Sequence, residues 1–144
     1  MTTQTQRPKL DDLLADEWNP EYTRVEAVIK NATGADVSLT PNGTRGIPVK
    51  IVTGVYCICL EADGANAVGV ILSDKAFVIA NGLTDTEKHV ILVRGPAVIR
   101  TDGISSTDAA GATLTKATIK TALEALNVPI IVKPQATQYT VQLT

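Results

Sequence analysis

The chain has 144 residues, of which 44% are hydrophobic and only 3% aromatic, so we expect one domain with an aliphatic core. Its 13 basic and 15 acidic residues give a net charge of −2, which argues against the basic footprint that nucleic-acid or membrane-surface binding needs. No apolar run is long enough for a transmembrane helix, and the polar N-terminus lacks the core of a secretion signal. Because a small domain with few large rings buries little area per residue, we expect it to gain stability by oligomerising.

The N-terminal stretch differs from the rest of the chain in charge and in apolar spacing. Residues 1–24 hold three basic and five acidic residues, whereas the remaining residues are balanced. Leu10, Leu13 and Leu14 fall at i, i+3 and i+4, and Trp18 follows one turn later. This spacing predicts a short helix with one apolar stripe, which would be marginal alone and needs a surface to pack on.

Asn19-Pro20 would stop that helix before the apolar pattern changes. We therefore expect an N-terminal arm over residues 1–21 and a single β-rich domain over residues 22–144. The apolar stripe either packs on its own domain or docks on a partner. The amphipathic pattern alone does not distinguish between these two surfaces.

From Tyr22 onward the apolar period changes to two, which is typical of half-buried strands. Strands are expected at residues 25–29, 37–39, 47–51, 55–61, 67–72, 76–80, 89–100 and 128–132. Asp63-Gly64 is a tight-turn signal, and Gly95-Pro96 predicts a bend or bulge inside the longest β-rich segment.

One long helix is expected near the C-terminus, over about residues 115–126. Ile119, Leu123 and Leu126 fall on one face of it, at i, i+4 and i+7. The tail beyond Lys133 ends in an alternating pattern that could add an edge strand. The elements together predict an α+β, β-dominated fold: a small mixed β-sheet or barrel-like domain with one main C-terminal helix and an N-terminal arm.

Candidate chemical residues are few. Cys57 and Cys59 share one face of a predicted strand, and His89 is the only other soft ligand, so at most three ligands could gather where a structural zinc site needs four. Free cysteine is commonly a small buried hydrophobe, and we interpret both thiols in that way. We expect no metal site.

His89 could act as a general base beside Asp85 or Glu87, but no nucleophile motif accompanies it, and its position suits a solvated residue at a strand edge. The glycines form no phosphate-binding loop. We therefore expect no enzymatic activity, no catalytic residues and no cofactor.

Four segments resemble the head decoration proteins of bacteriophages, of the lambda type. They are residues 22–28 (YTRVEAV), 46–49 (GIPV), 63–72 (DGANAVGVIL), and 90–98 (VILVRGPAV) followed by the small-residue helix and strand of 119–132. The motifs are short and apolar, and their order and spacing carry the resemblance. The tail after Val132 and the Cys57/Cys59 pair depart from the family pattern.

The resemblance implies a homotrimer that binds the major capsid protein on the outer surface of the expanded phage head and stabilises it against packaged DNA. It implies a protein made in the host cytoplasm and located in the virion. It also implies an arm that becomes ordered on the shell, and the capsid-docking residues would then be Leu10, Leu13, Leu14 and Trp18. β-Augmentation could supply such binding without catalytic residues.

Two alternatives stay open. The chain could be another phage virion β-domain, from a tail or baseplate, or a small trimeric β-rich enzyme. The enzyme alternative lacks an acidic metal motif and a phosphate loop.

Overall fold

The computed structural model describes residues 13–31, 36–39, 46–72, 77–105 and 112–134. Within these ranges β-strands dominate, and one longer helix, α3 (Lys116–Glu124), packs on them. A short helix and two 3-10 turns complete the described elements: α2 (Pro20–Thr23), η1 (Glu61–Asn66) and η2 (Thr101–Gly103). This is the β-dominated α+β fold that the sequence predicts, with its main helix near the C-terminus.

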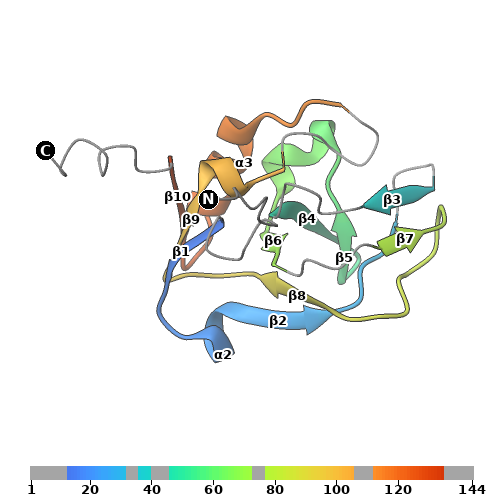
Figure 1. The fold of residues 1–144 in the computed structure, drawn as a ribbon, viewed down its shortest axis with the longest axis horizontal. Coiled ribbons are helices and arrows are strands. Elements are labelled where there is room, and N and C mark those ends of the chain that lie inside the picture. The colour runs from blue at the N-terminus through green and yellow to red at the C-terminus, as the bar shows by residue number, and fades with distance from the viewer. Residues whose placement is uncertain (1–12, 32–35, 40–45, 73–76, 106–111, 135–144) are drawn as a thin grey trace, which may run out of the picture.

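The largest sheet has five strands in the order β2-β8-β6-β4-β5, and every neighbouring pair is antiparallel. Its strands are β2 (Arg24–Ala27), β4 (Ile47–Val52), β5 (Val55–Ile58), β6 (Gly69–Ile71) and β8 (His89–Leu92). A separate pair, β3 (Val37–Leu39) with β7 (Phe77–Ile79), lies at the far end of the molecule in Figure 1.

The five-stranded sheet is buried on both faces at its central strands, β6 and β8. Val70 and Leu92 point into one hydrophobic cluster, while their chain neighbours Ile71 and Ile91 point into a second one. A strand that is buried on both faces has a continuous run of apolar residues in its sequence, instead of alternating apolar and polar residues. This explains why the segment around β6 shows no polar alternation in the sequence.

A second sheet contains three strands in the order β1-β9-β10: β1 (Leu14–Glu17), β9 (Ala97–Arg100) and β10 (Ile130–Lys133). β1 runs antiparallel to β9, and β10 runs parallel to it. β10 and α3 also pack together, since the backbone N–H of Val132 donates to the Glu124 carboxylate at 3.1 Å. In Figure 1 this sheet lies at the opposite end of the molecule from β3 and β7.

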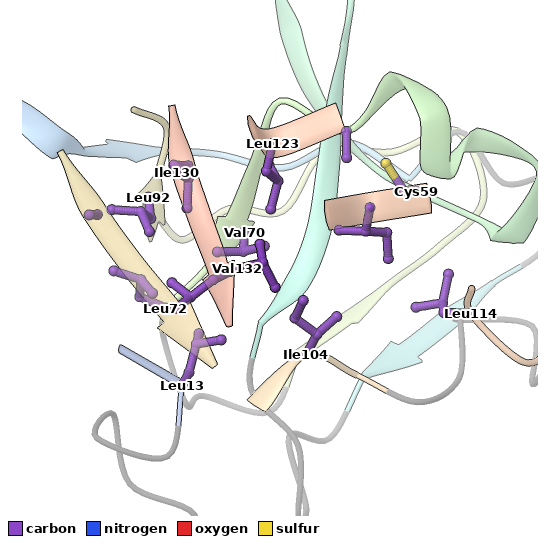
Figure 2. Packing of buried hydrophobic residues seen from close by; sticks show 14 residues of the cluster. Leu13, Cys59, Val70, Leu72, Leu92, Ile104, Leu114, Leu123, Ile130 and Val132 are labelled. Atoms are coloured by element: carbon purple, nitrogen blue, oxygen red, sulfur yellow. The ribbon is translucent and has the colours of Figure 1, made fainter. Parts of the chain in front are cut away.

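The first cluster fills the space between the three-stranded sheet, α3 and the five-stranded sheet, as Figure 2 shows. Ile99 and Ile130 enter it from the three-stranded sheet, and Ile119 and Leu123 enter it from α3; none of the four is exposed to solvent. The helical spacing of Ile119 and Leu123 is therefore a core-facing stripe, as predicted.

The predicted bend at Gly95-Pro96 is confirmed, and it separates β8 in one sheet from β9 in the other. A Cβ atom on Gly95 would lie 1.9 Å from the carbonyl oxygen of Pro129, so only glycine allows this close approach of the two backbones. One long β-rich segment is thereby shared between two sheets.

The predicted strand at 55–61 is shorter in the structure, because the chain turns into η1 after β5. There the Asp63 carboxylate accepts a hydrogen bond from the N–H of Leu60 at 3.1 Å, and it also pairs with Lys50 at 2.9 Å. The predicted tight turn at Asp63-Gly64 is thus part of a 3-10 helix. The strand expected in the tail beyond Lys133 lies outside the described residues.

Candidate interaction surface around Trp18

The structure separates the three described residues of the predicted docking stripe. Leu13 is fully buried in the first cluster, Leu14 is half-buried at the start of β1, and Trp18 is 69% exposed. Leu10 lies outside the described residues. The prediction of a single helix through this segment is wrong, because residues 14–17 form a strand that pairs with β9.

Backbone pairing and burial explain this difference. A helix of about three turns is marginal in water, whereas β1 gains a hydrogen-bonded partner strand and places Leu13 in the core. Leu13 is therefore a core residue and is not accessible for docking. From Leu13 to Glu17, the segment expected to be an arm is part of the domain.

Trp18, the only tryptophan of the chain, is held in place although its indole is exposed. Its backbone N–H donates to the carbonyl oxygen of Pro96 at 3.0 Å. Its ring meets the Tyr22 ring edge-to-face, with centroids 6.0 Å apart, and the Arg94 guanidinium lies 5.0 Å from the Tyr22 centroid on the ring's face. Tryptophan, tyrosine and arginine are the residue types most enriched in binding hot spots.

A groove of about 580 Å³ lies beside Trp18. It is lined by Asp16, Glu17, Trp18, Pro96, Ala97, Val98, Val128, Pro129 and Ile131. Asp16, Val98 and Ile131 occupy neighbouring register positions on β1, β9 and β10. Their chain neighbours Ile99 and Ile130 are buried in the first cluster, so the groove lies on the face of the sheet that points away from the core. We call this feature the Trp18 groove.

The two acidic residues of the Trp18 groove differ in their surroundings. The Glu17 side chain is 5% exposed and forms an ion pair with Arg24 at 2.6 Å, while the hydroxyl of Thr23 donates a further hydrogen bond to it. Burial acts to raise the pKa of Glu17, but the hydrogen bonds from Arg24 and Thr23 and the charge of Arg24 outweigh it and hold the pKa below its ordinary value.

Asp16, in contrast, is exposed, and its Oδ1 accepts the backbone N–H of Glu17 at 2.9 Å. This bond satisfies one backbone donor of the edge strand β1 locally. Asp16 is therefore the acidic side chain that the groove presents to solvent.

The two cysteines are buried free thiols, each about 1% exposed. Burial, together with the nearby negative charge of Asp63, raises the pKa of Cys59 to about 12, although Lys50 acts in the opposite direction. Cys59 belongs to the first hydrophobic cluster. Among the described residues, no group of three or more His, Cys, Asp or Glu side chains could hold a metal ion.

His89 is not the solvated edge residue that was expected. Its side chain is fully buried at the start of β8, and its Nε2 lies 2.6 Å from Oδ2 of Asp85, one of its two candidate partners. A general base must reach the proton that it abstracts, and this imidazole has no solvent-exposed surface from which to do so.

Sequence reasoning found Trp18 but missed Tyr22, Arg94, Val98 and Ile131 as parts of the same surface. Val98 and Ile131 have the pattern of ordinary strand residues, and nothing in that local pattern shows that the described residues leave a groove on their face of the sheet. Only the pairing of β1, β9 and β10 brings Val98 and Ile131 next to the segment that ends in Trp18.

Comparisons with protein-family models, with curated proteins and with solved structures found no match to this chain. In the part of the chain that the structure describes, no helix has the length and apolarity needed to span a bilayer.

Proposed function

We propose that this chain is a capsid decoration protein of the lambda type, which binds as a homotrimer to the major capsid protein on the outer surface of the expanded phage head. It acts there as a structural protein and not as an enzyme. The observation that carries the proposal is where the resembling segments lie in the fold.

These segments are far apart in the sequence but adjacent in space. The segments at 22–28, 90–98, 63–72 and 46–49 contribute β2, β8, β6 and β4, which are consecutive neighbours in the five-stranded sheet. The remaining segment, 119–132, contributes most of α3 and β10, which pack against the first cluster. The resemblance therefore covers one contiguous structural unit, which supports a shared fold more strongly than scattered short motifs do.

The Trp18 groove supports the same proposal, because it has the properties of an interaction surface. An exposed, well-positioned tryptophan with tyrosine and arginine neighbours lies beside an apolar groove. A cement protein needs such a surface, since it acts through binding alone, and many weakly bound copies on one lattice reach high avidity. We assign Trp18 as the main contact with the shell.

The test is to mix purified protein with expanded, undecorated phage heads and to measure co-sedimentation. The wild-type chain should bind, and light scattering after gel filtration should give three times the chain mass of 15.2 kDa for the free protein. A monomer that does not sediment with the heads would refute the proposal.

Trp18→Ala and Leu83→Ala form a matched pair for the contact itself. Both remove a large exposed hydrophobic side chain, 69% and 59% exposed, and only Trp18 lines the groove. We expect Trp18→Ala to weaken head binding at least tenfold, as hot-spot truncations do, and Leu83→Ala to bind as the wild type does. Equal binding by both variants would place the contact elsewhere on the molecule.

A further inference from the structure

We propose that the Trp18 groove is the binding site for residues 7–10 of the same chain, Arg-Pro-Lys-Leu, so that the free protein masks its own interaction surface. The chemistry of the groove and the position of β1 in the chain point to this occupant. We also propose that this masking segment is displaced when the protein binds the shell, a step that rests on the proposed function.

The groove favours an occupant with apolar and basic side chains. Its walls are aliphatic, proline and tryptophan side chains, and of the described residues that line it none is basic. Glu17 is already paired with Arg24, so Asp16 is the acidic group left to meet a cation. Aromatic- and proline-lined grooves take up extended, proline-containing segments well, because such segments lose little entropy on binding.

Residues 7–10 have the matching composition. Before Arg24, the only basic residues of the chain are Arg7 and Lys9, and they flank Pro8 and precede Leu10. The basic side chains match Asp16, and Pro8 and Leu10 match the apolar walls.

The length of the connection is also suitable. Residues 7–10 are joined to Leu13 by Asp11 and Asp12 alone, and Leu13 immediately precedes β1, which forms one side of the groove. Four extended residues span about 13 Å, which is the distance along a strand from Leu14 to Trp18. A tethered segment has an effective concentration in the millimolar range, so even a weak contact is populated.

Trp18 supplies the measurement, because it is the only tryptophan in the chain. In the full chain, Arg7→Glu with Lys9→Glu should shift its emission to longer wavelength and raise the acrylamide quenching constant about twofold, as expected when a partly populated tethered contact is lost. The control, Lys88→Glu with Lys133→Glu, makes the same charge change at two exposed lysines outside the groove and should leave both readings unchanged. Circular dichroism spectra of the variants should match that of the wild type.

A synthetic peptide of residues 1–12, added to the Arg7→Glu/Lys9→Glu protein, should reverse the emission shift. Identical emission from the wild type and this variant, or a peptide without effect, would overturn the masking proposal. Mixed oligomers test which chain supplies the segment. One subunit type carries Trp18→Phe and an intact segment, and the other carries Arg7→Glu/Lys9→Glu and the tryptophan that is observed. If mixing restores the wild-type emission, the occupant comes from a neighbouring subunit and the same-chain assignment is wrong.

Release on the shell is tested separately with expanded heads. If the segment masks the surface, Arg7→Glu/Lys9→Glu should bind heads more tightly than the Lys88→Glu/Lys133→Glu control. Weaker binding than the control would show that Arg7 and Lys9 contact the shell themselves and would overturn the displacement step. The fluorescence measurements use no heads, so failure of the proposed function and failure of the masking proposal remain distinguishable.

Discussion

The Arg24 guanidinium donates hydrogen bonds to the Glu17 carboxylate from two of its nitrogen atoms. Nη2 of Arg24 lies 2.6 Å from Oε1 of Glu17, and Nε of Arg24 lies 2.8 Å from Oε2. Glu17 ends β1 in the three-stranded sheet, and Arg24 begins β2 in the five-stranded sheet. The pair therefore connects the two sheets across α2, directly beside the Trp18 groove.

This pair can be measured with a double-mutant cycle of Glu17→Ala and Arg24→Ala. Each single variant should lose stability, since it leaves a partly buried charge without its partner. The double variant should be less destabilised than the sum of the singles, with a coupling of about 1–3 kcal/mol. Denaturant unfolding gives all four free energies. Additive losses would show that the connection between the sheets does not depend on this pair.

Leu13 provides a second test, because its assignment changed between sequence and structure. Leu13→Ala should destabilise the protein by about 2–5 kcal/mol, since it removes a fully buried side chain from the first cluster. Leu14→Ala removes the same atoms from a half-buried neighbour and should cost clearly less. If Leu13→Ala unfolds at the same temperature as the wild type, Leu13 belongs to a dispensable arm after all.

Local pattern was sufficient for most of the fold. The alternation at Val25 and Ala27 predicted β2, and the helical spacing of Ile119 and Leu123 predicted α3, because each element turns one face to a core. These features depend on residues a few positions apart. In these two elements the tertiary contacts agree with the local pattern.

The N-terminal segment and the groove depend on long-range pairing and could not be read in this way. Leucines at i, i+3 and i+4 fit a helix. However, Leu14 pairs with Ile99, far along the chain, and this backbone pairing makes the segment a strand. The walls of the Trp18 groove likewise come from three separate parts of the chain. A local pattern contains no information about such pairings.

Gly69 is a further position where the structure makes a sharp prediction. A Cβ atom there would lie 2.5 Å from the carbonyl oxygen of Leu92, on the neighbouring strand β8, so Gly69→Ala must push β6 away from β8. We expect a loss of about 1–3 kcal/mol, as for other overpacked sites. Gly64→Ala is the control, because its Cβ would meet only ordinary contacts at 3.5 Å and beyond. Equal melting temperatures for the two variants would contradict the described pairing.

The buried thiols should be inert in the native protein. With its pKa raised to about 12 by burial, Cys59 has a thiolate fraction about a thousandfold lower than that of an ordinary thiol. A thiol reagent should therefore modify the native protein slowly and the denatured protein quickly. Replacing both Cys57 and Cys59 by Val should leave the oligomeric state unchanged. Rapid native labelling of both thiols would contradict their placement.

The contact between Asp85 and His89 predicts a specific dependence of stability on pH. The Asp85 side chain is 11% exposed, and its Oδ1 also accepts the backbone N–H of Glu87 at 3.2 Å. Burial acts to raise the pKa of Asp85, but the hydrogen bond from His89, with those from the Glu87 and Thr86 backbone and the charge of His89, holds it below its ordinary value.

A carboxyl group whose pKa is lower in the folded state than in the unfolded state stabilises the fold above its unfolded pKa of about 3.9, and this contribution is lost as the pH falls through the folded pKa. Asp85→Asn should therefore reduce the free energy of unfolding by about 1–3 kcal/mol at pH 7. The difference from the wild type should shrink as the solution is acidified below about pH 4. Denaturant unfolding across this pH range, with the exposed carboxylate variant Glu26→Gln as the control, measures the effect. A difference between Asp85→Asn and the wild type that stays constant with pH would show that the Asp85 carboxylate is not stabilised in its charged form by this contact.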